Sequence, residues 1–551
     1  MNETLAYAAA SAPALYLAHR SYLRLLLSKA KHPSLRGHAR MALRFSKLVR
    51  FYEYDEREFF ECDGAPSSVA QQRQAAFEAL SKSLRERAPL SIQRTHELEE
   101  SISDVEFTNA YRVPFQFRSR VREQLEVGNF ADATRGERLR DLDGNWSYDL
   151  GGSYGLNLLG YDFYKGCLER AVERVKDLGP VLGPYHPVIA DNVARLQEIS
   201  GLDEVSFHMS GTEAVMQAVR LARYHTGRSH IVRFCGAYHG WWDGVQAGVG
   251  NPRPAREVYT LKEMDEDTLR VLRKRRDIAC VLVNPLQALN PNGGAPSDST
   301  LVASDRSAHF DKAAYSRWLA RLREVCSERK IVLIFDEVFL GFRLARGGAQ
   351  EYFGVKADMV TYGKTLGGGL PIGVVCGRAD LMRRYRDDRP TDICFARGTF
   401  NSHPLVMATM NEFLRFVDTP EGRASYQGLD ERWNRRANLL NQRLERAGVP
   451  LRVANLMSVW TTLFTQPSRY NWMLQFYLRA EGLSLSWIGA ARFIFSHSCT
   501  DADFQDVCDR IVAGAVAMQR DGWWWKGAEL TNKSIKRRVA RELLRAALGR
   551  R

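Results

Sequence analysis

Short apolar runs that alternate with helical patterns occupy the chain from about residue 140 onward. Most are apolar at nearly every position, as strands buried on both faces of a parallel sheet are. Helical patterns separate several of the runs, for example residues 213–225, which end before Gly227. The runs are residues 205–209, 230–234, 278–283, 331–335, 359–362 and 372–376. This alternation predicts an α/β domain built on a mainly parallel sheet.

The formal charge of +14 is concentrated at the two ends of the 551-residue chain. Residues 1–50 carry nine Lys or Arg and one acid, and residues 526–551 carry nine and two. The ends therefore sum to +15, which leaves −1 for residues 51–525. A protein built around a nucleic-acid cleft would carry its cations within the folded surface. We therefore expect no nucleic-acid partner.

Cysteine usage and the N-terminal segment both indicate a reducing cytosolic compartment. The nine cysteines are scattered singly, without a CxxC pair or a run of histidines spaced as metal ligands, so we expect neither a disulfide framework nor a metal site. The uncharged stretch from Thr4 to His19 is too short to span a bilayer and contains Pro13. Its positive charges follow the apolar part, unlike those of a signal peptide.

The turn after the first apolar run is suited to binding a phosphate. Ser210, Gly211 and Thr212 follow the predicted strand and open a helix, where backbone amides and the helix dipole attract anions. The same residues would equally serve as an ordinary helix cap, with Ser210 or Thr212 at the N-cap position. The turn by itself is compatible with both interpretations.

Two further strand ends carry residues that are unusual in a buried position. Asp336 and Glu337 follow the run 331–335, where an acid needs a cationic partner: a protonated ring nitrogen of a ligand or, in a structural ion pair, Arg343. Lys364 follows the next run and precedes three glycines, which permit close approach of the backbone. A lysine in a dry pocket loses its proton and attacks carbonyl groups, whereas one on a glycine-rich surface turn stays charged.

A phosphate site, a buried acid and an activated lysine are together the parts that hold pyridoxal phosphate. At this point the sequence resembles the class III aminotransferases of the type I pyridoxal-phosphate fold, and most of all their glutamate-1-semialdehyde aminomutase branch. The resemblance covers about residues 105–520. It rests on the ordered motifs Met-Ser-Gly-Thr-Glu-Ala (209–214), Gly-Ala-Tyr-His-Gly (236–240), Phe-Asp-Glu-Val (335–338), Gly-Lys (363–364) and Gly-Thr-Phe-Asn-Ser-His-Pro (398–404).

The resemblance implies a role for each matching residue. Lys364 would bind the cofactor as a Schiff base and move a proton between substrate and cofactor, and Asp336 would keep the ring nitrogen protonated. Tyr238 would lie against the ring, and Thr399 would reach the phosphate of a neighbouring subunit, which implies a homodimer. The catalytic residues are then Lys364, Asp336 and Tyr238. The cofactor-binding residues are Ser210, Gly211, Thr212, Tyr238, His239, Asp336, Glu337, Lys364 and Thr399.

Departures from the family pattern concern the substrate pocket. Relatives carry Glu-Pro-Val where this chain begins Asn284-Pro285-Leu286-Gln287, and Leu340 replaces a threonine. In the stretch that matches the aminomutase Ser-Gln-Phe-Glu segment, Trp487 and Gly489 replace the glutamine and the glutamate. The pocket is expected to be less polar than that of an aminomutase. A larger apolar or carrier-bound carbonyl compound is therefore the expected substrate.

The resemblance also implies the fold and the domain organisation. We expect an α/β large domain with a mainly parallel seven-stranded sheet, a smaller α+β domain, and additional helices at both ends. The expected parts are a basic helical extension (1–104), the N-terminal part of the small domain with the entry to the large domain (105–180), the PLP-binding large domain (181–410), the C-terminal small domain (411–520) and a basic amphipathic tail (521–551).

The ends of the chain have the composition of lipid-binding segments. Ile535, Val539 and Leu543 recur at i,i+4 spacing among arginines, and the three tryptophans 523–525 precede them. A basic amphipathic helix with adjacent tryptophans fits an anionic membrane surface or an acyl carrier protein, and the N-terminal segment is similar. Alternatively, these helices pack on the enzyme body or a dimer partner, or their charges are simply solvated.

We therefore expect a cytoplasmic pyridoxal-phosphate aminotransferase, peripheral to the inner face of a membrane, that uses an amino donor to convert an aldehyde or ketone to an amine. The first alternative is an aminomutase, which moves the amino group within one molecule. An alternative of another class is a non-catalytic scaffold that binds a partner through its basic ends.

Overall fold

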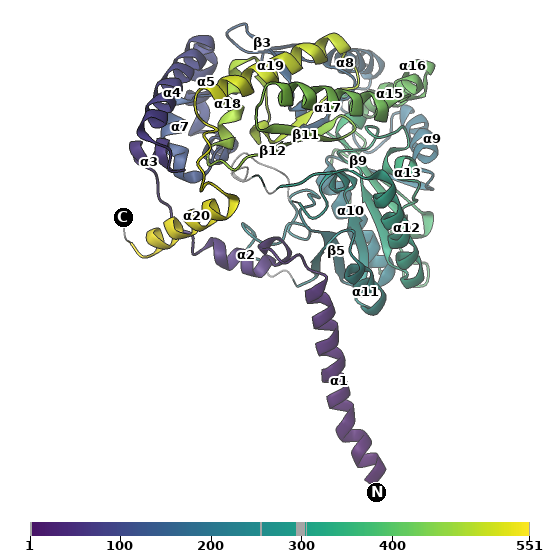
Figure 1. Ribbon diagram of the computed structural model, residues 1–551. Helices are drawn as coiled ribbons and strands as arrows, with labels where there is room; N and C mark the ends of the chain where they lie inside the picture. The colour runs from purple at the N-terminus through teal and green to yellow at the C-terminus, as the bar shows by residue number, and fades with distance from the viewer. Residues whose placement is uncertain (1–2, 254–255, 294–303, 305, 550–551) are drawn as a thin grey trace. The chain divides into compact units, whose positions relative to one another are not determined.

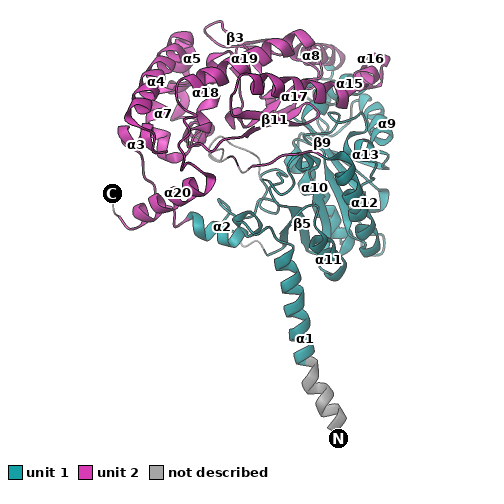
Figure 2. Ribbon diagram, viewed as in Figure 1, with its two compact units in different colours: residues 1–46, 175–295, 311–414 teal, residues 47–174, 296–310, 415–551 magenta. Residues whose placement is uncertain are grey.

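The computed structural model describes residues 3–253, 256–293, 304 and 306–549 (Figure 1). The chain divides into two compact units (Figure 2). Unit 1 comprises residues 1–46, 175–295 and 311–414, and unit 2 comprises residues 47–174, 296–310 and 415–551. The N-terminal extension is thus shared between the units, with its first helices grouped with unit 1.

Unit 1 is built on a seven-stranded sheet, as expected. All six predicted strands are present, and a short strand, β6, is added at one edge. β10 runs antiparallel to both of its neighbours, and the other strands are parallel to one another. In sheet order the strands are β4 (Glu204–His208), β10 (Gly373–Gly377), β9 (Met359–Gly363), β8 (Val332–Asp336), β7 (Ile278–Val283), β5 (His230–Phe234) and β6 (Val258–Leu261).

Helices of unit 1 cover the apolar strands. Ala218 and Leu221 on one of them, α10, belong to the same buried cluster as Leu282 and Ile334 of the sheet. Each fully buried Leu or Ile contributes about 1.5–3 kcal/mol to folding. The helices are α1 (Glu3–Lys29), α2 (Ala39–Ser46), α9 (Val188–Ser200), α10 (Gly211–Thr226), α11 (Glu266–Lys274), α12 (Lys312–Arg329), α13 (Gly348–Phe353), α14 (Ala379–Met382) and α15 (Pro404–Asp418), whose end lies in unit 2.

Unit 2 has α+β architecture with two small sheets. One is antiparallel, with the order β11 (Leu451–Leu456), β12 (Val459–Phe464) and β14 (Arg492–Ile494). The other has the order β1 (Ala133–Arg135), β2 (Arg138–Arg140), β3 (Trp146–Asp149) and β13 (Leu483–Ser484). Residues 141–145 form the turn of a β-hairpin between β2 and β3.

The helices of unit 2 come from both ends of the chain. Residues 67–87 form a long helix in the N-terminal extension, and residues 532–547 form the predicted C-terminal helix. The helices are α3 (Glu56–Glu61), α4 (Ser67–Arg87), α5 (Pro89–Glu99), α6 (Ser103–Tyr111), α7 (Arg118–Gln124), α8 (Tyr161–Val175), α16 (Pro420–Ala424), α17 (Leu429–Arg446), α18 (Leu474–Ala480), α19 (Asp501–Arg520) and α20 (Asn532–Ala547).

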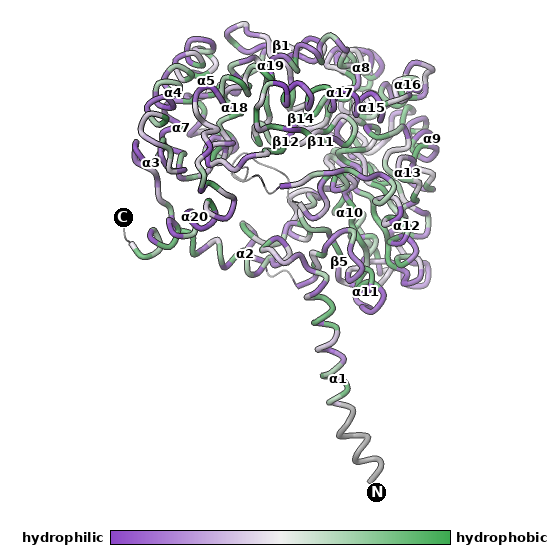
Figure 3. The backbone as a smooth tube through the Cα atoms, viewed as in Figure 1, coloured by the Kyte–Doolittle hydropathy of each residue, from purple (hydrophilic) through white to green (hydrophobic). Residues whose placement is uncertain are grey.

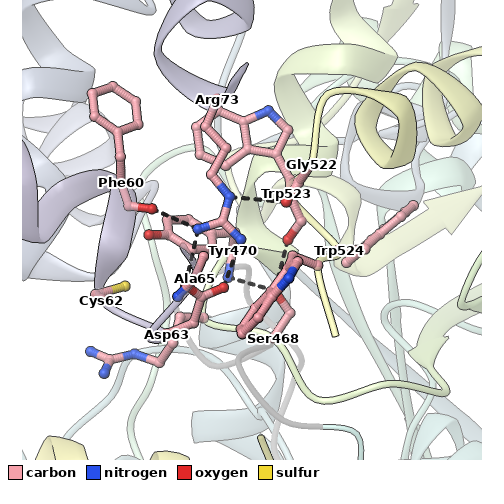
Figure 4. Close-up of polar contacts among 12 residues, drawn as sticks. Phe60, Cys62, Asp63, Ala65, Arg73, Ser468, Tyr470, Gly522, Trp523 and Trp524 are labelled. Carbon is pink, nitrogen blue, oxygen red and sulfur yellow. Dashed lines mark hydrogen bonds and ion pairs between the residues drawn. The ribbon is translucent and has the colours of Figure 1, made fainter. Parts of the chain in front are cut away.

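A buried arginine links the N-terminal helices to the C-terminal segment within unit 2. Arg73 of α4 is fully buried and forms an ion pair of 2.7 Å with Asp63 (Figure 4). Its Nε donates to the Gly522 carbonyl over 2.9 Å, and its guanidinium lies 4.4 Å from the centre of the Tyr470 ring. Every part of this cation is therefore compensated by an anion, a carbonyl or a ring face.

The expectation that the tryptophan cluster faces lipid is wrong for two of its members. Trp523 is fully buried and Trp524 is 5% exposed. The Trp523 indole donates to the Tyr477 hydroxyl over 2.8 Å, and the Trp524 indole donates to Asn471 Oδ1 over 2.9 Å. Large rings that find acceptors inside a protein are more stable there than in water, so this cluster belongs to the core of unit 2.

The C-terminal helix α20 packs within unit 2, as one of the alternatives predicted. Ile535 is 2% exposed. Glu542 forms an ion pair with Arg469 over 3.1 Å and accepts hydrogen bonds from the hydroxyls of Tyr52 and Tyr54. Helix α20 is therefore held by both a buried apolar residue and a half-buried acid. Within the described residues, no helix has the length and hydrophobicity required to cross a bilayer.

Candidate active site

Asp336 and His239 form the polar centre of the candidate site. Asp336 ends β8 and is 5% exposed, and His239 follows β5 and is 2% exposed. His239 Nδ1 donates to Asp336 Oδ2 over 2.8 Å. The other carboxylate oxygen, Oδ1, accepts from the Thr361 hydroxyl at 3.2 Å and the Val338 amide at 3.3 Å. These donors fix the orientation of the carboxylate.

Lys364 lies directly after β9 in a strained backbone conformation. Its φ is +50°, in the left-handed region, where a non-glycine residue costs about 1–3 kcal/mol. Burial lowers the pKa of its amine, Asp336 opposes that shift, and Arg343 reinforces it. The amine is therefore more easily deprotonated than that of a surface lysine, as a nucleophile requires.

The turn at residues 210–212 caps a helix, which is one of the two functions considered from the sequence. The Ser210 side chain caps α10 by accepting from the Glu213 amide over 3.3 Å. A Cβ on Gly240, where φ is +86°, would lie 2.5 Å from Thr212 Oγ1, and a Cβ on Gly211 would lie 2.5 Å from Val338. Only glycines allow these segments to meet, so the start of α10 lies close against the loop after β5 and the residues after β8.

Tyr238 is positioned by a residue that the sequence analysis assigned only to the substrate pocket. Asn284, which follows β7, donates from its side chain to the Tyr238 carbonyl over 2.9 Å. The Tyr238 ring remains 58% exposed, so it is accessible to a ligand. Sequence reasoning missed this role of Asn284 and the contact of Thr361 with Asp336. The position of Asn284 directly after β7 was a signal for its role, whereas Thr361 lies in the middle of β9 and carried none.

Glu337 and Thr399 lie apart from this centre. Glu337 is fully buried, and its Oε2 accepts from the Ala349 amide at the start of α13 over 2.6 Å. Burial raises the pKa of Glu337 to about 8, although the amides of Ala349 and Gln350 oppose that shift. Thr399 is exposed on the loop before α15. The described contacts therefore place Glu337 against a helix and leave Thr399 free to contact another molecule.

The residues present fit pyridoxal phosphate. Ser210, Tyr238, Asn284, Asp336 and Lys364 all come at the carboxyl ends of parallel strands of one sheet, where α/β proteins bind ligands. Two buried polar atoms at this edge, His239 Nε2 and Gln287 Oε1, have no hydrogen-bond partner among the described residues. Amides for a phosphate, a carboxylate for a ring nitrogen and an amine for a carbonyl complete the set.

The described residues hold no group of three or more His, Cys, Asp or Glu that would bind a metal ion. All nine cysteines are buried and free.

Comparison with known proteins agrees with this geometry. The family model for class-III aminotransferases matches residues 121–514. A glutamate-1-semialdehyde 2,1-aminomutase from Nitratidesulfovibrio vulgaris is 33% identical over 417 residues, which cover 72% of this chain and 95% of that protein.

Solved structures show the same fold. An omega-transaminase from Sphaerobacter thermophilus is 26% identical with a TM-score of 0.59, over 71% of this chain and 91% of that one. A glutamate-1-semialdehyde aminomutase from Pseudomonas aeruginosa PAO1 is 18% identical with a TM-score of 0.65, over 82% and 99%. Fold and site together define a pyridoxal-phosphate-dependent transferase of the type I fold. Within that class, the chain belongs to the class-III aminotransferase family.

Proposed function

We propose that this enzyme transfers an amino group from an amino acid to an aldehyde or ketone whose carbon skeleton is apolar. The observation that carries the substrate proposal is an aromatic cluster in unit 2. Trp487 lies 6.1 Å from Phe107, which lies 4.8 Å from Tyr111, measured between ring centres. Phe107 and Tyr111 are about half exposed, so together with Trp487 they offer an apolar surface where an aminomutase would carry a glutamine.

A lone cation supports the choice of an amino acid as donor. Arg492 begins β14, and burial lowers the pKa of its guanidinium to about 10. Its Nε is buried and has no hydrogen-bond partner in the part of the chain that the structure describes. An unpaired, partly buried guanidinium is costly unless a ligand supplies the anion, and a carboxylate matches its geometry. We therefore assign the donor carboxylate to Arg492.

The chain's own residues account for the chemical steps. Pyridoxal phosphate, when bound, supplies an aldehyde that takes up amines and a ring that accepts electrons. Lys364 Nζ is the nucleophile that holds the cofactor and then the base that moves the proton at the substrate carbon. Asp336 Oδ atoms, oriented by His239 and Thr361, hold a proton on the ring nitrogen. The first amides of α10 bind the phosphate.

The test is a single-turnover half-reaction followed by the loss of visible cofactor absorbance. The donor is an amino acid or the matching amine without its carboxylate. Arg492→Gln is expected to raise the KM for the amino acid about 10–100-fold, because it removes a charge-assisted hydrogen bond. The KM for the amine should stay unchanged. Equal effects on both donors would refute the assignment of Arg492.

A second series addresses the acceptor. Aldehydes of increasing apolar size are expected to react with increasing kcat/KM in the wild type, and Trp487→Gln should remove that preference. If the wild type shows no preference for apolar size, the acceptor proposal is wrong.

The aminomutase reaction remains the alternative, favoured by the 33% identity to proteins of that name. It requires no external donor. If the enzyme alone converts glutamate semialdehyde as fast as it does with an added amino acid, the aminomutase reaction is established and the proposed transamination is refuted. The scaffold alternative is set aside, because the chain belongs to an enzyme family and has a complete site.

We also propose a homodimer. Thr399 is exposed on a loop whose Ile393 and Phe395 are 58% and 70% exposed, which supports burial of this loop against a second copy. Sedimentation of the purified protein should give twice the mass of the chain. A monomer that still reacts with amino acids would refute the proposal. A cytoplasmic location is proposed on the basis of the nine buried thiols.

A further inference from the structure

The N-terminal helices are the part of unit 1 that the amino-transfer chemistry does not use. Residues 4–52 contain nine Lys or Arg and no acid, and they lie outside the family match at residues 121–514. Their cations gather without a counter-charge: burial lowers the pKa of the Lys31 amine, and the nearby Arg40 lowers it further. This segment is therefore a positive surface added to the enzyme.

Helix α2 presents apolar and cationic side chains to solvent on adjacent faces. Met41 and Phe45, four residues apart, are 57% and 49% exposed, and α2 has no buried residue. Arg40 and Arg44 are exposed on the neighbouring face. Ala39, the first residue of α2, lies near Gly248 of the same unit: a Cβ built on Gly248 would lie 3.6 Å from the Cβ of Ala39. The apolar ridge is thus unpartnered and flanked by arginines.

Within residues 13–29, whose side chains the structure describes, helix α1 is anchored near its C-terminal end. Leu26 and Ala30 are buried, and the Ala30 carbonyl accepts from the Lys262 amide over 2.8 Å. Before them, Leu15, Tyr22 and Leu25 fall on one helical face with exposures of 69%, 47% and 56%. Figure 3 shows hydrophobic and hydrophilic residues along the described part of this helix. α1 therefore adds a second exposed apolar stripe to the same segment.

Charge complementarity decides among the occupants of this surface. A second copy of the chain would meet it through a two-fold interface, which would place arginines opposite arginines. A nucleic acid would pair with the cations but gain nothing from exposed Met, Phe and Leu. An anionic bilayer would bind both the cations and the apolar side chains, because its phosphates attract arginines and its acyl boundary accepts apolar side chains.

We infer that α1 and α2 dock the enzyme on an anionic lipid bilayer, with Phe45 and Met41 entering the headgroup boundary and Arg40 and Arg44 contacting lipid phosphates. Helix α20 is held on unit 2 by Ile535, which is 2% exposed, and by the Glu542–Arg469 ion pair, so we assign the docking to α1 and α2 although Leu544 and Leu548 at the end of α20 are exposed. The inference is independent of the substrate proposed above. A membrane-bound enzyme would meet substrates that partition into the bilayer or its surface.

Flotation with lipid vesicles tests the inference on the full-length, cofactor-loaded protein. Vesicles of phosphatidylcholine with phosphatidylglycerol are compared with vesicles of phosphatidylcholine alone. The wild type is expected to float only with the anionic vesicles. The double variant Arg40→Glu with Arg44→Glu should weaken binding at least tenfold, given about 1 kcal/mol for each cation near the surface. Met41→Ser with Phe45→Ser should weaken it several-fold on the same vesicles.

A matched control changes the charge equally at the other end of the chain. Arg537 and Arg541 are exposed on α20, and replacing both with Glu should leave flotation within twofold of the wild type. The inference is overturned if this control loses binding as strongly as the α2 variant, or if the α2 variant still floats. It is also overturned if the α2 variant changes the sedimentation mass, which would identify the surface as a subunit interface.

Unchanged cofactor absorbance and melting temperature in each variant establish that binding, rather than folding, was altered. If the wild type binds vesicles of phosphatidylcholine alone as strongly as it binds the anionic vesicles, the arginines have no role in binding and the inference is overturned.

Discussion

The imidazole of His239 and the carboxylate of Asp336 lie 2.8 Å apart, although 97 residues separate them in the chain. This hydrogen bond connects the loop after β5 to the end of β8 and sets the direction of the carboxylate. It also makes His239 a residue that positions the aspartate.

Replacing Asp336 should lower activity more than replacing His239. Asp336→Asn removes the charge that holds a proton on the ring nitrogen, and we expect kcat to fall at least 10³-fold. His239→Ala only misorients the carboxylate, which should cost about 10²-fold. His225→Ala, at the far end of α10, is the control and should retain activity. Equal losses for the first two variants would mean that His239 acts directly on the reaction.

Lys364→Ala should abolish the visible absorbance of lysine-bound cofactor and lower kcat at least 10³-fold, because both the nucleophile and the base are lost. Lys356→Ala, an exposed lysine on the same unit, should change neither quantity. An unchanged absorption spectrum in the Lys364 variant would show that another residue holds the cofactor.

Gly240→Ala should weaken cofactor binding specifically. The added Cβ would lie 2.5 Å from Thr212 Oγ1, so the phosphate turn must shift. Gly227→Ala is a matched control, because φ is also positive there (+64°) but no atom lies within 4 Å. Both should lose about 1 kcal/mol of stability from backbone strain, but only Gly240→Ala should raise the Kd for pyridoxal phosphate, about tenfold or more, measured by fluorescence titration. The same rise in both variants would attribute the effect to strain alone.

Arg73→Met should destabilise unit 2 by about 3–5 kcal/mol, because it leaves Asp63 buried without its cation. The exposed pair Arg57–Glu61 offers the comparison: Arg57→Met should cost far less stability, because solvent screens this pair. Thermal melting followed by tryptophan fluorescence measures both, since Trp523 lies beside Arg73. Similar melting temperatures for the two variants would mean that the buried pair contributes little.

Glu263 should make the enzyme less stable as the pH rises. Its side chain is buried beside Tyr315, whose hydroxyl donates to Oε1 over 2.5 Å, and burial raises the pKa of Glu263 to about 8. The folded state therefore keeps a proton that the unfolded state loses above its ordinary pKa of about 4.3. Its stabilising contribution is complete below that pH and is lost as the pH rises toward 8, by up to about 1.4 kcal/mol per pH unit.

Glu263→Gln stays neutral and still accepts from Tyr315, so its melting temperature should fall less than that of the wild type between pH 5 and 8. Parallel curves for the two proteins would refute the raised pKa.

Periodicity and order along the chain were sufficient to predict the sheet and to place Asp336 and Lys364 at the ends of its strands. The apolar runs ending at Phe335 and Tyr362 became β8 and β9, and Asp336 and Lys364 at their ends have the burial and the lowered lysine pKa expected of the site. Such features are local, because the strand pattern and the turn that follows it depend on residues that are consecutive in the sequence. The short strand β6 lacked a long enough apolar run to be predicted.

The partners of individual side chains were decided only by the tertiary structure. The sequence indicated that Asp336 needs a cation but not that His239 would orient it, and it could not distinguish Trp523 in the core from a tryptophan at a lipid surface. The two basic ends of the chain look alike in composition. They differ because the Ile535 side chain finds a buried place in unit 2, whereas Met41 and Phe45 remain exposed, and burial depends on packing between distant segments.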